Sequence, residues 1–146
     1  MQTIFELSAT LATGLFTGAA LFISFVEHPA WMELSPSLAV QEFVAAYRRM
    51  VIMQPSLAFL GGLGAVLSWW WGASVWWLAG GAAMGSIFPY TAFRMLSINN
   101  QLHDPGLDKN PARAMDLLGQ WGRRHRIRVL IGLASFLLFL ALLKGA

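Results

Sequence analysis

Three polar side chains share one face of a predicted helix near the end of the chain. Trp121, His125 and Arg128 stand at positions i, i+4 and i+7, so an indole, an imidazole and a guanidinium lie along one helical face. Residues 129–143 are apolar, which places these groups where a membrane-spanning helix meets the interface. An ionisable side chain at that depth that faces other helices is a candidate functional group. An imidazole there can serve as a general base, and a guanidinium can stabilise an oxyanion.

His28 and Asn99 are the other candidates for chemistry. His28 closes the first apolar segment on a face of small and polar residues, and Asn99, near the end of the third, is costly to bury without a partner. His103 follows Asn99 by four residues and lies beside a turn, where contact with lipid headgroups or a helix cap explains it without chemistry. Membrane topology alone explains three basic neighbours of His125, which are Arg123, Arg124 and Arg126.

The composition identifies the elements that must hold these residues. Of the 146 residues, 57% are hydrophobic and only 12% are charged, a balance typical of an integral membrane protein. Strands are not expected, because apolar and polar residues do not alternate with a period of two. We therefore predict an all-α protein, a single-domain antiparallel four-helix bundle in the membrane. Four apolar segments are each about long enough to span roughly 30 Å of hydrocarbon, at residues 3–28, 50–71, 74–98 and 121–143.

Local signals predict where the helices begin and end. Residues 35–50 have an amphipathic pattern, which predicts a short interfacial helix in the first large loop. The first helix is expected to end at His28, because Pro29 disfavours a helical conformation at the residue before it. Pro89 predicts a kink in the third helix. Asn110 is the expected N-cap of a helix that continues unbroken into the last span.

The basic residues predict an orientation. All of the Lys and Arg residues except Lys144 fall at the two larger loops, so the positive-inside rule places these loops in the cytoplasm and both termini outside, in the inner (plasma) membrane. The positive charge therefore reflects orientation and not nucleic-acid binding. No basic residue precedes the first apolar segment, so a signal peptide is not expected. Tryptophans around residues 72–73 predict an aromatic belt at the outer interface, made of Trp69, Trp70, Trp71, Trp76 and Trp77.

The chain has no cysteine, which excludes disulfides, thiolate metal sites and cysteine nucleophiles. Its remaining short motifs, in chain order, are Glu27-His28-Pro29, Tyr47-Arg48-Arg49, Met53-Gln54, Pro89 with Thr91, Ile98-Asn99 with Leu102, and Trp121-Gly122 with His125 and Arg128. Taken together, these motifs resemble the anthrone oxygenase-like family of small four-helix membrane proteins, over nearly the whole chain. Characterised fungal members of that family oxidise polyketide anthrones to anthraquinones with O₂, and many bacterial relatives have no known substrate. The resemblance implies an oxidoreductase whose site residues are His28, Asn99, Trp121, His125 and Arg128.

The chemistry of such a reaction suits these residue types. Removing the acidic benzylic C–H of an anthrone leaves a delocalised anion that can pass an electron to O₂ without a metal. The protein must then supply a base, a partner for the oxyanion and a dry pocket. His28 or His125 is the expected base, since an imidazole pKa of about 6.5 leaves the ring largely neutral at pH 7. Arg128, with Asn99 and Trp121, is expected to hold the oxyanion. The expected partner is an apolar small molecule from the lipid phase, and no cofactor is predicted.

Two other functions stay open at this point. A metal or haem oxidase would bind iron, copper or haem through histidine, and the available ligands are Glu27, His28, His103 and His125. A non-enzymatic scaffold or lipid-binding subunit would use the same polar end for helix association and contact with membrane lipids, with assembly into a homo-oligomer left open.

Overall fold

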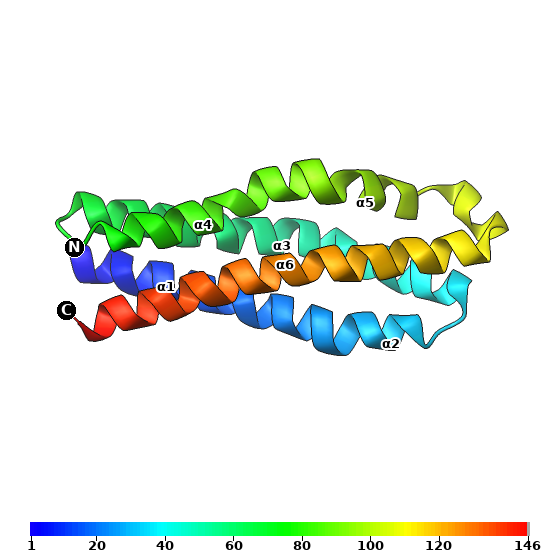
Figure 1. Ribbon diagram of the computed structural model, residues 1–146, viewed down its shortest axis with the longest axis horizontal. Helices are drawn as coiled ribbons and strands as arrows, with labels where there is room; N and C mark the ends of the chain where they lie inside the picture. The colour runs from blue at the N-terminus through cyan, green and yellow to red at the C-terminus, as the bar shows by residue number, and fades with distance from the viewer. Residues whose placement is uncertain (146) are drawn as a thin grey trace.

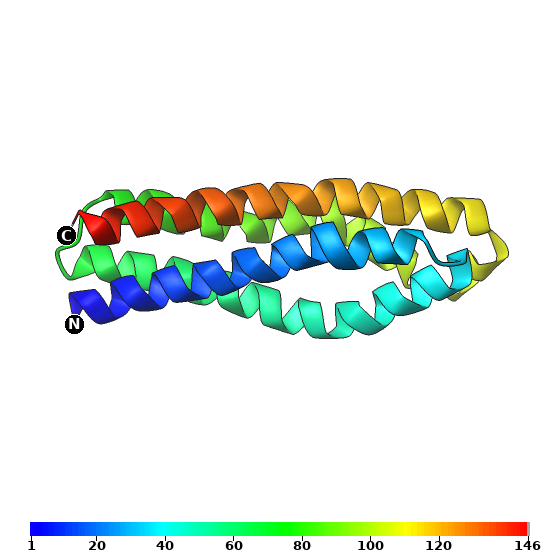
Figure 2. The ribbon, with the colours of Figure 1, turned by 90° about the horizontal axis from the view of Figure 1, so that it is seen from below.

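In the computed structural model, residues 1–145 form four long helical rods and no strand. The rods are antiparallel, and both termini lie at one end of the molecule (Figure 1 and Figure 2). Each rod packs against the next one along the chain, and the first rod also packs against the fourth. This arrangement confirms the predicted all-α four-helix bundle. The nine elements, in order, are α1 (Gln2–Phe22), η1 (Ile23–Glu27), α2 (His28–Met32), α3 (Pro36–Trp70), α4 (Trp76–Tyr90), η2 (Thr91–Met95), α5 (Leu96–Leu102), η3 (Pro105–Lys109) and α6 (Pro111–Lys144).

Three of the rods are long and apolar enough to cross a membrane. They are Gln2–Met32, Pro36–Trp70 and Pro111–Lys144. The third rod is built from the shorter pieces α4, η2 and α5. These lengths indicate a membrane protein. The short turn 71–75 lies at the same end as the termini, and both other connections lie at the opposite end (Figure 1), as the charge pattern requires. The membrane concerned and the side that faces the cytoplasm stay predictions.

The first rod does not end at His28, so the prediction for that boundary is wrong. The chain passes through a π-helical turn, η1, and then continues helically through Pro29 to Met32. Within this turn the N–H of His28 bonds to the carbonyl of Ile23, five residues back instead of four. The widened backbone relieves the clash that a proline ring makes with the preceding turn of a regular helix.

A second π-helical turn, η2, follows Pro89 in the third rod. This is the place at which the sequence predicts a kink, and π-helical turns of this kind frequently occur at functional sites. The short helix expected at residues 35–50 is the first part of the continuous helix α3, because no breaker separates it from the span. The unbroken helix that follows Asn110 is confirmed. The side-chain Oδ1 of Asn110 accepts the N–H of Arg113 at 3.2 Å.

The two halves of the bundle have different cores. Toward the termini, small residues permit close packing, and a Cβ on Gly64 would lie 3.0 Å from the backbone of Ala9. Trp77 belongs to this core and not to an interfacial belt, because it is 2% exposed and stacks on Phe139 at 4.8 Å. The other four tryptophans of the predicted belt are exposed. The opposite half is filled by larger aromatic side chains around Trp121, and the candidate site lies at its edge.

Candidate active site

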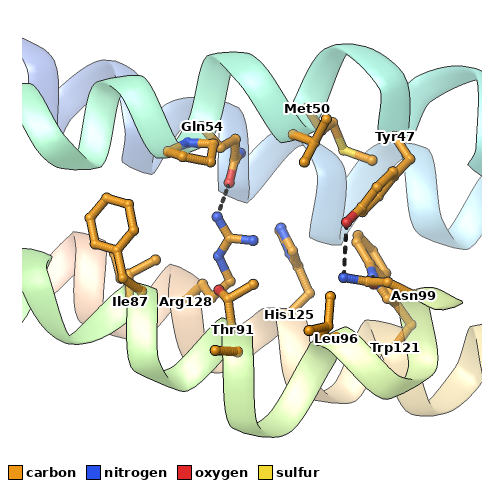
Figure 3. Close-up of a pocket in the computed structure, with 14 residues that line it drawn as sticks. Tyr47, Met50, Gln54, Ile87, Thr91, Leu96, Asn99, Trp121, His125 and Arg128 are labelled. Carbon is orange, nitrogen blue, oxygen red and sulfur yellow. Dashed lines mark hydrogen bonds between the residues drawn. The ribbon is translucent and has the colours of Figure 1, made fainter.

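A pocket of about 290 Å³ opens between α3, the third rod and α6 (Figure 3). Half of its lining is apolar, with residues such as Met50, Ile87 and Leu96. The polar half brings together groups from four elements, because the antiparallel rods place the middle of α6 opposite the middle of α3. Among residues 1–145, no acidic residue lines the pocket. The polar lining residues are Tyr47, Gln54, Thr91, Asn99, Trp121, His125 and Arg128.

His125 is the titratable base of this pocket. Its side chain is 1% exposed, and its ring stacks on Trp121 with 4.7 Å between centroids and 17° between planes. Nδ1 lies 2.8 Å from Oγ of Ser24, which belongs to η1. In the tautomer whose Nδ1–H donates to that hydroxyl, Nε2 is an unprotonated base. Within residues 1–145 Nε2 has no hydrogen-bond partner, so it is free to accept a proton from a molecule in the pocket.

Arg128 is the buried cation of the pocket. It is 9% exposed, and its Nη2 donates to Oε1 of Gln54 at 3.0 Å. The guanidinium also lies over the ring of Phe16, 5.6 Å from the centroid, which is a cation–π contact. A buried charge without an acidic neighbour is costly, which makes Arg128 a candidate functional residue. The arrangement offers an oxyanion a fixed positive partner in surroundings of low polarity.

Trp121, Asn99 and Tyr47 form a hydrogen-bonded chain across the other end of the pocket. The indole Nε1 donates to Oδ1 of Asn99 at 3.0 Å, and Nδ2 of Asn99 donates to the hydroxyl of Tyr47 at 3.1 Å. Figure 3 shows the ring of His125 between this chain and Arg128. Both polar atoms of the buried amide that the sequence marks as costly therefore have a hydrogen-bond partner.

His28 is the one predicted site residue that does not line the pocket. Its Nε2 donates to the carbonyl oxygen of Leu118 at 2.8 Å, and its ring stacks on that of Trp121 with 6.1 Å between centroids. The ring rests directly over the backbone of Gly122. The two imidazoles therefore do not meet around one cavity, and His28 packs against Trp121 without lining the pocket.

Substitution of Gly122 tests the packing of the His28 ring against α6. Gly122→Ala is expected to lower the free energy of unfolding by about 1–3 kcal/mol, because the new methyl group would overlap three atoms of the His28 ring, which is held by its bond to Leu118. Thermal unfolding of the purified protein measures the effect. Gly119→Ala is the matched control one turn earlier, where the nearest side-chain atom is 3.6 Å away, and it should be neutral or stabilising. Equal stability of the two variants would contradict this account of His28.

His103 and Glu27 lie outside the pocket. His103 is exposed, donates from Nδ1 to the backbone oxygen of Asn99 at 2.6 Å, and packs its edge against Tyr47. Among residues 1–145, no three side chains of His, Cys, Asp or Glu lie close enough together to hold a metal ion. The alternative ligand set Glu27, His28, His103 and His125 is therefore not assembled in this fold.

Four residues at or beside the pocket are not among the site residues predicted from the sequence, namely Tyr47, Gln54, Ser24 and Thr91. For Gln54 the sequence does carry a signal, since it is a polar residue inside an apolar segment. In the structure its side chain is only 1% exposed. Tyr47 carried none, because an amphipathic helix accommodates a tyrosine equally well at an interface. Ser24 is identified only by its contact with His125, 101 positions further along the chain.

A protein-family profile described as anthrone oxygenase matches residues 43–138. The matched segment begins in the first part of α3 and ends in α6, so it includes every residue that lines the pocket and leaves out His28 and Ser24. No curated protein matches the chain, and no solved structure matches it.

Proposed function

Because the chain belongs to the anthrone oxygenase family, we propose that it is a membrane-embedded oxygenase that oxidises an apolar, anthrone-like or quinol-like aromatic compound with O₂. The observation that carries the proposal is the placement of one free imidazole nitrogen, on His125, beside one buried guanidinium, on Arg128, in a pocket without an acidic residue. A base and an anion-stabilising group are the two functions that deprotonation of an aromatic ketone requires.

The first step is removal of the acidic C–H of the substrate. Nε2 of His125 accepts the proton, and the negative charge moves to the substrate oxygen, which Arg128 faces at one end of the pocket. The imidazolium that forms stacks on the indole of Trp121, whose π face favours a cation. Arg128 is already paired with Gln54, so little reorganisation is needed when the charge develops.

The second step uses O₂ as the oxidant. The electron-rich anion transfers one electron to O₂, and the resulting pair combines into a substrate hydroperoxide that takes its proton back from His125. Loss of the second hydrogen from the same carbon breaks the O–O bond, leaving a carbonyl group and one molecule of water. One oxygen atom of O₂ therefore enters the product, the other leaves as water, and His125 returns to its neutral form.

The apolar rim of the pocket supports access from the lipid phase. Val51 on α3, Phe88 on α4 and Leu96 on α5 line the pocket and are 47%, 40% and 49% exposed. These side chains face outward between α3 and the third rod, where the surrounding medium of a membrane protein is hydrocarbon. An apolar aromatic compound dissolved in the bilayer would reach His125 without crossing an aqueous phase.

Oxygen uptake and isotope labelling test the proposed function. Purified full-length protein in detergent is expected to oxidise anthrone faster than micelles without protein, consuming one O₂ per molecule and placing one ¹⁸O atom from ¹⁸O₂ in the quinone. We expect the rate to survive dialysis against a chelator, since the proposed steps use only side chains. Release of hydrogen peroxide in place of water, loss of activity with the chelator, or a rate equal to that of empty micelles would overturn the proposal.

A further inference from the structure

The hydrogen-bonded chain at one end of the pocket has only one chemically allowed direction. An indole N–H can only donate, so the atom of Asn99 that faces Trp121 must be its oxygen. The amide nitrogen of Asn99 then faces Tyr47 and donates to the phenol oxygen. Since that oxygen accepts, the hydroxyl proton of Tyr47 is left for another acceptor, and it finds none within residues 1–145. Tyr47 therefore presents a free donor at the pocket.

The same reasoning applies at the opposite end. A guanidinium has no acceptor atom, so Oε1 of Gln54 must be the atom that faces Arg128. This leaves Nε2 of Gln54 as a donor, and both this nitrogen and Nε of Arg128 are fully buried without a partner. Unpaired buried donors are expensive, and natural structures contain few of them. These two atoms are enclosed by the protein. Nη1 of Arg128 also has no hydrogen-bond partner within residues 1–145 but is not enclosed, so it is the donor that a ligand can reach at this end of the pocket.

The helix geometry sets the distance between these two ends. Tyr47 and Gln54 are seven residues apart on α3, and Trp121 and Arg128 are seven residues apart on α6. Seven residues correspond to a rise of about 10 Å. After a hydrogen bond of about 2.9 Å at each end, the two ligand oxygens lie roughly 5–10 Å apart, a spacing found across small fused aromatic rings. His125 stands between the two ends, beside the middle of such a ligand (Figure 3).

We propose that Tyr47 is a specificity-determining residue, aimed by Trp121 through Asn99, and that the pocket binds a flat aromatic ligand with two acceptor oxygens. One oxygen binds at the guanidinium of Arg128, and the other accepts from the Tyr47 hydroxyl. This inference rests on the proposed function for the choice of site and adds the second oxygen. A ligand without that oxygen leaves the Tyr47 hydroxyl unpaired in an apolar pocket, and sites built to bind such a group discriminate against analogues that lack it.

Binding of unreactive tricyclic compounds tests the inference without any turnover. Equilibrium dialysis of the full-length protein in detergent, without O₂, would compare 9,10-anthraquinone, with two opposed carbonyl oxygens, and fluorenone, with one. Wild type is expected to prefer anthraquinone by about tenfold, as one additional hydrogen bond allows. Tyr47→Phe should abolish that preference. Trp121→Phe should reduce it, and should have no further effect in the Tyr47→Phe background, because Trp121 acts on the ligand through Tyr47.

Tyr90→Phe is the matched control, since Tyr90 is the only other tyrosine of the chain and its hydroxyl donates to the backbone of Arg124, outside the pocket. This variant should keep the wild-type preference. A preference that survives Tyr47→Phe, or one that disappears equally in Tyr90→Phe, would overturn the inference. Because the assay measures binding of unreactive compounds, such a result would leave the oxygenase function standing, whereas failure of oxygen uptake would leave the ligand preference measurable.

Discussion

Replacing His125 with glutamine is expected to lower the rate of anthrone oxidation at least about a hundredfold, the effect typical of losing a general base. Glutamine keeps a polar side chain that can bond to Ser24, but it offers no basic nitrogen to the pocket. The initial rate of oxygen uptake at saturating substrate, corrected for uncatalysed oxidation, measures the change. Replacing Ser24 with alanine should have a smaller effect, because it loosens the imidazole without removing it.

A second histidine variant separates the base from a general effect of removing an imidazole. His103→Gln changes an exposed ring outside the pocket and should retain most of the wild-type rate. Circular dichroism and size-exclusion chromatography would establish that each variant is folded. If His125→Gln oxidised anthrone at the wild-type rate, His125 would not be the base, and the proposed mechanism would be wrong.

Replacing Arg128 with methionine is expected to lower turnover about 10²–10³-fold while leaving the protein at least as stable. The loss follows from removing the charge that stabilises the oxyanion. The stability follows from removing a buried cation that has no acidic partner at the pocket, since methionine fills a similar volume beside Phe16. Oxygen uptake measures the first effect and the midpoint of thermal unfolding the second. A purely structural arginine would show the reverse pattern, with lost stability and little lost activity.

Arg126→Met is the control for this change. Arg126 lies on the same helix two residues earlier, but its side chain is exposed and points away from the pocket. Arg126→Met removes one positive charge and adds one methionine, as Arg128→Met does, but it changes no group that lines the pocket. It should therefore keep the wild-type rate. Arg128→Lys keeps the charge without the planar guanidinium and should recover part of the activity. Equal losses in the variants of Arg126 and Arg128 would assign the effect to net charge and not to the site.

Much of the fold follows from local properties of the chain. The lengths of the apolar segments and the absence of a strand pattern predict four antiparallel helices, because spanning a membrane and satisfying the backbone are requirements on each segment separately. The predictions that are wrong concern a helix boundary and the burial of a side chain, both of which depend on the surrounding structure. Pro29 ends an isolated helix, but here a π-helical turn carries the chain past it. Trp77 has the composition of a belt residue, but packing against Phe139 buries it.

The candidate site also has one part that follows from local sequence and another that depends on tertiary contacts. Helical periodicity by itself determined that Trp121, His125 and Arg128 share one face, since residues on one helix have fixed relative positions. Only the tertiary structure decided that Gln54 pairs with Arg128, that Tyr47 joins Asn99, and that His28 bonds to Leu118 outside the pocket. These partners are separated by 74, 52 and 90 positions along the chain. Contacts of that range depend on which helices pack together and at what rotation about their axes, which no local pattern specifies.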